Sequence, residues 1–125
     1  MKDINEVRLR GRIGSIKFFG QDNSIASISL ATNDGYKGKN GWVDITTWHR
    51  VKAFSSRPGM IDFSLLEKGQ IAEVSGRIVN NRYKDGNGND RESMEIEASD
   101  IAIINEFKRD NSQGGRSRND YDEEF

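Results

Sequence analysis

The sequence contains no cysteine, one histidine and one proline among its 125 residues. Without cysteine the chain can form neither a disulfide scaffold nor a thiolate zinc site, and it has no cysteine nucleophile. A single histidine is too few for a multi-histidine metal centre, and no pair of acidic residues stands out as a general acid and base. We therefore expect no catalytic residues, no metal and no cofactor, and hence a protein that is not an enzyme.

Long apolar segments are also missing. No apolar run approaches the roughly 18 residues that a membrane-spanning helix requires. The first six residues, Met1 to Glu6, contain no apolar segment of the kind found in signal peptides. These two absences predict a cytoplasmic protein with no membrane partner.

The charge is unevenly distributed along a chain that has the length of one domain. Hydrophobic residues make up 34% of the sequence and charged residues 31%, and this polar composition predicts a modest core with a disordered portion. The formal net charge is −1. The last sixteen residues hold five acids and two arginines, a net charge of −3, which leaves a body with a net charge of +2. This mildly basic body is only weak evidence for nucleic-acid binding. Whether the body binds nucleic acid depends on where its charges lie.

Alternating apolar and polar residues predict an all-β body. The expected strands are Val7 to Ile13, Ile25 to Thr32, Trp42 to Phe54, Gln70 to Val79 and Glu92 to Ile104. A helix of about two turns is expected from Ile61 to Gly69, between the third and fourth strands. Five strands with a helix in that place are typical of an OB-fold, a small Greek-key barrel.

The remaining segments are expected to be connections. Asn33 to Gly41 is rich in glycine and lysine and predicts a mobile, basic connection, whereas Lys84 to Asp90 predicts a hairpin loop. We expect a folded domain over residues 1–107, a disordered linker over 108–119 and an acidic tip over 120–125.

The strand from Trp42 to Phe54 carries the candidate site. Alternate residues of a strand point to opposite faces, and one face holds Trp48, Arg50, Lys52 and Phe54 in succession. Aromatic rings can stack on nucleic-acid bases while arginine and lysine pair with phosphates, which suits a single strand because the bases of a duplex are already stacked. The alternative is that this face packs beneath the helix or a neighbouring subunit, with its cations reaching out to solvent.

Aromatic residues next to basic ones recur at two other places. Tyr36 lies near Lys37 and Lys39 in the glycine-rich connection, and Tyr83 is flanked by Arg82 and Lys84 at the base of the hairpin. This recurrence favours nucleic-acid binding over packing. His49 lies on the apolar side of its strand, which indicates a buried or interface residue.

Several segments resemble the bacterial single-stranded-DNA-binding protein family over residues 4–106. The similarity lies in Val7 to Gly14, Ile28 to Thr32, Trp48 to Phe54, Leu66 to Gln70, Val74 to Ile78, Arg82-Tyr83 and Gly88 to Arg91. The resemblance implies an OB-fold that assembles as a homotetramer and binds single-stranded DNA without sequence preference. It places base-stacking residues at Tyr36, Trp48, Phe54 and Tyr83, phosphate-facing residues at Arg50, Arg82 and Arg91, and a subunit interface at His49.

The C-terminal tip also resembles that of the family. It comprises Asp120, Tyr121, Asp122, Glu123, Glu124 and Phe125. In the family such a tip recruits replication and repair proteins, through attraction to a basic pocket and capture of the terminal phenyl group and carboxylate. The family's usual Ile-Pro before the last residue is replaced here by Glu123-Glu124, and the linker is shorter. The alternative is a tail that only improves solubility.

These features together predict a non-catalytic, sequence-independent single-stranded-DNA-binding protein, associated with the nucleoid and acting in DNA replication, recombination and repair. Three other functions remain open. One is a dimeric OB-fold accessory protein of the primosome type, which native mass would distinguish. The others are an RNA-binding OB or cold-shock-like protein, and an interaction module whose aromatic face binds a protein partner.

Overall fold

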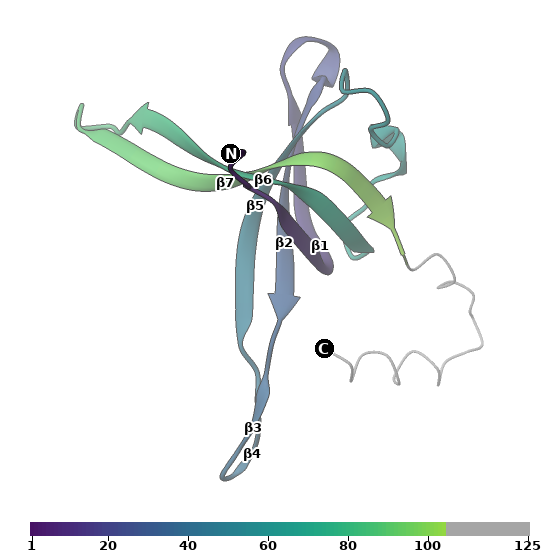
Figure 1. The fold of residues 1–125 in the computed structure, drawn as a ribbon, viewed down its shortest axis with the longest axis vertical. Helices are drawn as coiled ribbons and strands as arrows, with labels where there is room; N and C mark the ends of the chain where they lie inside the picture. Colours follow the sequence, from purple (N-terminus) through teal and green to yellow (C-terminus); the bar gives the residue numbers. More distant parts are fainter. Residues whose placement is uncertain (105–125) are drawn as a thin grey trace.

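The computed structural model describes residues 1–104, and β-strands account for most of them (Figure 1). The elements are β1 (Val7–Phe19), η1 (Gln21–Asn23), β2 (Ile25–Asn33), β3 (Tyr36–Gly38), β4 (Gly41–Val43), β5 (Thr46–Phe54), η2 (Phe63–Leu65), β6 (Ile71–Lys84) and β7 (Asp90–Ile103). Five strands close a barrel in the order β1-β2-β5-β7-β6, and β3 pairs with β4. The five-stranded barrel predicted from the strand order is thus confirmed.

The barrel is closed by a single parallel pairing. Every other neighbouring pair of strands is antiparallel, whereas β5 and β7 run parallel and place Val51 opposite Ile96. Two long ribbons extend from the barrel (Figure 1): the free ends of β6 and β7, and the continuation of β2 and β5 into β3 and β4. The predicted DNA-binding residues lie on the barrel wall and on these ribbons.

The inward side chains form one hydrophobic core, as the alternating pattern requires. In β2 the residues Ala26, Ile28 and Leu30 are buried, as predicted, and Val51 and Ala53 of β5 are buried beside them. The complete buried apolar set is Ile13, Ala26, Ile28, Leu30, Val51, Ala53, Leu66, Ala72, Val74, Ile96, Ala98 and Ile101. Since inward residues of β5 alternate with outward ones, burying Val51 and Ala53 turns Arg50 and Lys52 to the outside of the barrel.

The predicted two-turn helix is wrong in its extent. Only a single 3-10 turn forms, at η2, where the Asp62 carboxylate accepts a hydrogen bond from the Ser64 backbone N–H at 3.0 Å. This hydrogen bond lowers the pKa of Asp62 below its usual value. The chain then becomes extended at Leu66, whose side chain is buried in the core. Burial of Leu66 therefore prevails over the local preference for a longer helix.

The connection predicted over Asn33 to Gly41 is also more ordered than expected. It contains a hairpin, in which Tyr36 pairs with Val43 and Lys37 with Trp42. The expected strand from Trp42 to Phe54 is correspondingly divided into β4 and β5, with two residues between them outside either strand. Five glycines and asparagines over residues 33–41 make this segment look irregular in sequence, although it is largely a β-ribbon.

The hairpin loop predicted between β6 and β7 is confirmed. It joins Lys84 to Asp90, and the Asp85 carboxylate accepts hydrogen bonds from the backbone N–H groups of Asn87 and Asn89 at 2.9 and 3.0 Å. The predicted linker and acidic tip, over residues 108–125, lie outside the described residues. Within residues 1–104 no helix is long and apolar enough to span a membrane.

Candidate nucleic-acid interface

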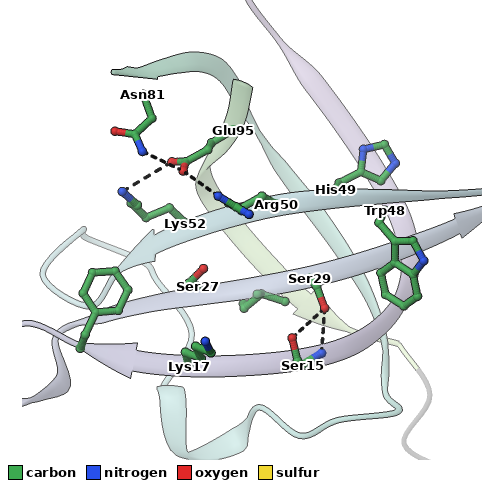
Figure 2. A pocket seen from close by; sticks show the side chains of 12 residues that line it. Ser15, Lys17, Ser27, Ser29, Trp48, His49, Arg50, Lys52, Asn81 and Glu95 are labelled. Atoms are coloured by element: carbon green, nitrogen blue, oxygen red, sulfur yellow. Dashed lines mark hydrogen bonds and ion pairs between the residues drawn. The ribbon is translucent and has the colours of Figure 1, made fainter. Parts of the chain in front are cut away.

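A groove runs across the outer surface of β1, β2 and β5 (Figure 2). It has a volume of about 570 Å³ and is lined by Ser15, Lys17, Phe19, Ser27, Ile28, Ser29, Trp48, His49, Arg50, Lys52, Asn81 and Glu95. The structure thus brings together Trp48, Arg50 and Lys52, which the alternating pattern of the third predicted strand places on one face. The groove is polar along its floor, since serine side chains of β1 and β2 lie between the aromatic and basic residues.

Trp48 presents an open aromatic surface at one end of this groove. Its side chain is 61% exposed, so Trp48 is not part of the core of this barrel. Its ring lies against Gly14 of β1, where a Cβ atom would come within 2.5 Å of the indole Cζ3. Glycine at this position therefore leaves room for the indole against the barrel wall, and most of the side chain remains open for contact with a planar ligand.

Two of the three groove cations, Arg50 and Lys52, share one buried carboxylate. Glu95 of β7 is only 4% exposed, and it lies 3.5 Å from the Lys52 ammonium and 3.9 Å from the Arg50 guanidinium. The Asn81 side-chain amide donates a further hydrogen bond to it at 3.3 Å (Figure 2). A buried carboxylate requires such partners. A phosphate that binds Arg50 or Lys52 must therefore compete with Glu95 for them.

Phe54 lies at the opposite end of the face, and it is only partly exposed. It is opposite Ile25 in the β2–β5 ladder, and Ile25 is opposite Phe19 in the β1–β2 ladder. Phe19 is 43% exposed and lines the groove. The aromatic surface at this end therefore includes Phe19 as well as the predicted Phe54.

The sequence patterns missed several residues that line the groove. Ser15, Lys17 and Phe19 lie on β1 beyond Ile13, where the expected first strand ended. The register of β1 against β2 shifts between Ile13 and Ser15, so the simple alternation is interrupted there. Lys17 followed by Phe19 at a spacing of two is the signal that would have revealed this part of the groove.

The residues predicted around Tyr83 form a second concavity, on the β6–β7 hairpin. It has a volume of about 540 Å³ and is lined by Arg82, Tyr83, Lys84, Asp90, Arg91 and Glu92. Tyr83 is 49% exposed. The predicted residues around Tyr83 therefore lie together in one cavity, and Trp48 lies in a different one.

Two of the hairpin cations are held by hairpin acids. Lys84 pairs with Asp90 at 2.6 Å and Arg91 with Asp85 at 2.9 Å. The hydrogen bond from Arg91, together with those from the loop backbone, lowers the pKa of Asp85, so its carboxylate remains ionised at neutral pH. Arg82 makes no ion pair with any other residue in the range 1–104, which makes it the least neutralised cation of this concavity.

Tyr36, Lys37 and Lys39 belong to the β3–β4 ribbon and line neither cavity. Tyr36 is 53% exposed, at the base of β3. His49 is partly buried and forms a 2.9 Å hydrogen bond with the Thr32 hydroxyl through Nε2. Its place in a subunit interface stays a prediction. The described part of the chain contains no cluster of His, Asp and Glu side chains that could hold a metal ion.

Comparison with known proteins shows to which family the chain belongs. Residues 4–104 match the model of the single-strand binding protein family. The chain belongs to this family. Its barrel is accordingly the OB-fold that the strand order predicted.

Relatives of this family member occur in mitochondria and bacteria. A mitochondrial single-stranded DNA-binding protein of Drosophila melanogaster is 35% identical over 108 residues, which cover 82% of this chain and 73% of that protein. Single-stranded DNA-binding protein 1 of Xylella fastidiosa is 28% identical over 123 residues, which cover 94% and 89% of the two chains. The solved complex of Plasmodium falciparum SSB with ssDNA is similar with a TM-score of 0.65 and 26% identity, covering 84% of this chain and 98% of that chain.

Proposed function

We propose that this protein binds single-stranded DNA without sequence preference and without catalysing a reaction. Bases stack on Tyr36, Trp48, Phe54 and Tyr83. Phosphates pair with Lys37, Lys39, Arg50, Lys52, Arg82, Lys84 and Arg91. The observation that carries the proposal is Trp48, whose indole is 61% exposed on the outer barrel wall beside two cations.

The chemistry of the groove favours a single strand over a duplex. An exposed indole can stack on any unpaired base, because every base has a π-face, and this contact carries no sequence information. Phosphate contacts add affinity that decreases with salt, by a slope of about −0.7 per contact on a logarithmic scale for single strands. Binding therefore has a salt-sensitive part from the cations and a salt-resistant part from stacking.

Intrinsic tryptophan fluorescence tests this function directly, since the chain has two tryptophans, both exposed. We expect oligo-dT to quench the emission strongly, and the quenching to persist in moderate salt. Duplex DNA of equal length should leave the emission unchanged. The absence of both quenching and binding by oligo-dT would overturn the proposal and leave the aromatic face as a protein interface. Stronger binding of RNA than of DNA would instead favour an RNA-binding role.

We also propose that the protein acts as a homotetramer in DNA replication, recombination and repair, within the cytoplasmic nucleoid. Support comes from family membership and from His49, which lies partly buried at the barrel surface rather than in the core. Native mass measurement distinguishes the tetramer from a dimeric primosome-type accessory protein.

The acidic tip, Asp120 to Phe125, is proposed to recruit replication and repair proteins. Its four acids attract a basic pocket, and its terminal phenyl group and carboxylate supply a specific anchor. Deleting these six residues should abolish capture of such partners while leaving the affinity for oligo-dT unchanged or slightly higher, because a competing negative charge is removed. Phe125→Ala, which keeps all four acids, is the matched control for the anchor. Loss of DNA binding on deletion would contradict this role.

A further inference from the structure

The β3–β4 hairpin is a direct extension of the β2–β5 ladder. The last pair of that ladder joins Asn33 to Thr46, and the first pair of the hairpin joins Tyr36 to Val43. Two residues separate these pairs on each strand, and the Asp34 N–H donates to the Ile45 carbonyl between them at 2.8 Å. The register is therefore continuous from the barrel to the tip of the ribbon. Figure 1 shows this ribbon below the barrel.

An unbroken register fixes which side chains share a side of the ribbon. Successive residues of an extended strand alternate between sides, and directly paired residues lie on the same side. Counting from Trp48 by twos leads through Thr46 and Asp44 to Trp42, whose partner across the ribbon is Lys37. Tyr36 and its partner Val43 lie on the opposite side. The aromatic residue that follows Trp48 along its own side is thus Trp42, not Tyr36.

The contacts of Trp42 agree with this count. Its indole N–H donates to the Asp44 carboxylate at 2.7 Å, and Asp44 is two residues along the same strand. The indole lies against Gly35, where a Cβ atom would come within 2.5 Å of Nε1. The side chain is nevertheless 63% exposed. Trp42 is therefore held in place by Asp44 and Gly35 while most of its side chain is open to solvent, and both tryptophans lie against a glycine.

We propose that Trp42 is a further base-stacking residue, which contacts the single strand bound across Trp48 on the same side of the ribbon. Lys37, which faces Trp42 across the ribbon and forms no ion pair within residues 1–104, contacts the adjoining phosphate. Trp42 and Trp48 are six residues apart, on the order of 20 Å along an extended strand, so they contact different nucleotides. This inference rests on the proposed function, and it adds Trp42 to the stacking residues proposed there.

Single-tryptophan variants distinguish a DNA contact at Trp42 from one at Trp48, because these are the only tryptophans of the chain. In the Trp48→Phe protein all indole emission comes from Trp42, and in the Trp42→Phe protein it comes from Trp48. We expect saturating oligo-dT to quench both proteins and duplex DNA to quench neither. Quenching of Trp48 together with unchanged emission from Trp42 would overturn this inference while leaving the proposed function intact. Unchanged emission from both variants, together with no binding of a labelled oligonucleotide, would overturn the inference and the proposed function alike.

Affinity measurements identify the nature of the contact. Trp42→Leu, which keeps an apolar side chain but removes the ring, should weaken binding of labelled oligo-dT about tenfold, whereas Trp42→Phe should retain most of the affinity. Ile45→Ala is the matched variant, because Ile45 lies on the opposite side of the same ribbon and is 45% exposed, and it should change the affinity much less. A loss for Ile45→Ala as large as that for Trp42→Leu would contradict a specific contact at Trp42. Equal losses for Trp42→Leu and Trp42→Phe would assign Trp42 to hairpin packing through Asp44.

Discussion

Replacing Trp48 with alanine should weaken binding of oligo-dT by about 5- to 150-fold, which corresponds to the loss of one stacked base at about 1–3 kcal/mol. The free energy of unfolding should change little, because the indole is largely exposed on the outside of the barrel. Fluorescence anisotropy of a labelled oligonucleotide measures the affinity, and thermal unfolding of the free protein measures the stability.

Two controls make the result for Trp48 specific. Trp48→Phe keeps a π-face and should lose much less affinity than Trp48→Ala. The slope of log affinity against log salt should be the same in both variants, because the proposed phosphate contacts of Arg50 and Lys52 are retained. A marked fall in thermal stability with unchanged affinity would mean that Trp48 packs against protein and does not bind DNA.

Replacing Leu30 with alanine should lower the free energy of unfolding by about 2–5 kcal/mol, the usual cost of such a truncation in a packed core. Leu30 is fully buried in β2, opposite His49 of β5 and Ile13 of β1. Because single domains are stable by only about 5–15 kcal/mol, a substantial share of the total stability is lost. Chemical denaturation monitored by circular dichroism, at a fixed protein concentration, measures the change.

Leu65→Ala provides the matched control, because it is the same substitution at a side chain that is 57% exposed. It should change the free energy of unfolding by no more than about 0.5 kcal/mol. If the Leu30 and Leu65 variants were equally stable, the assignment of Leu30 to the core would be wrong. DNA affinity measured well below the midpoint of unfolding should be similar in both, since neither residue lines the groove.

The alternation of apolar residues was sufficient to predict the barrel and much of its core. Ala26, Ile28 and Leu30 recur at every second position and are buried together. The pattern failed where tertiary contacts prevail over local signals. Burial of Leu66 shortens the expected helix to one turn, and the register shift after Ile13 conceals the second half of β1.

The candidate site was predictable in part for the same reason. Trp48, Arg50 and Lys52 share one face because alternation is local to a single strand. Glu95 carried no comparable signal, since it reaches these cations from β7, more than forty residues later in the sequence. The side of the ribbon occupied by Trp42 likewise depends on the pairing between strands, which the composition of the glycine-rich segment did not suggest.

The carboxylate beneath the groove affects how readily a bound strand can be exchanged. Glu95 lies 3.9 Å from Arg50 and 3.5 Å from Lys52 in the free protein. A cation released by a phosphate can therefore form an ion pair with Glu95 and does not remain unpaired. The departing phosphate thus leaves no isolated charge behind, and the energetic barrier to its release is lower than at a site without an internal counter-ion. If phosphates bind here as proposed, we expect each to be held weakly and to exchange quickly, while the lifetime of the complex depends mainly on the stacked bases.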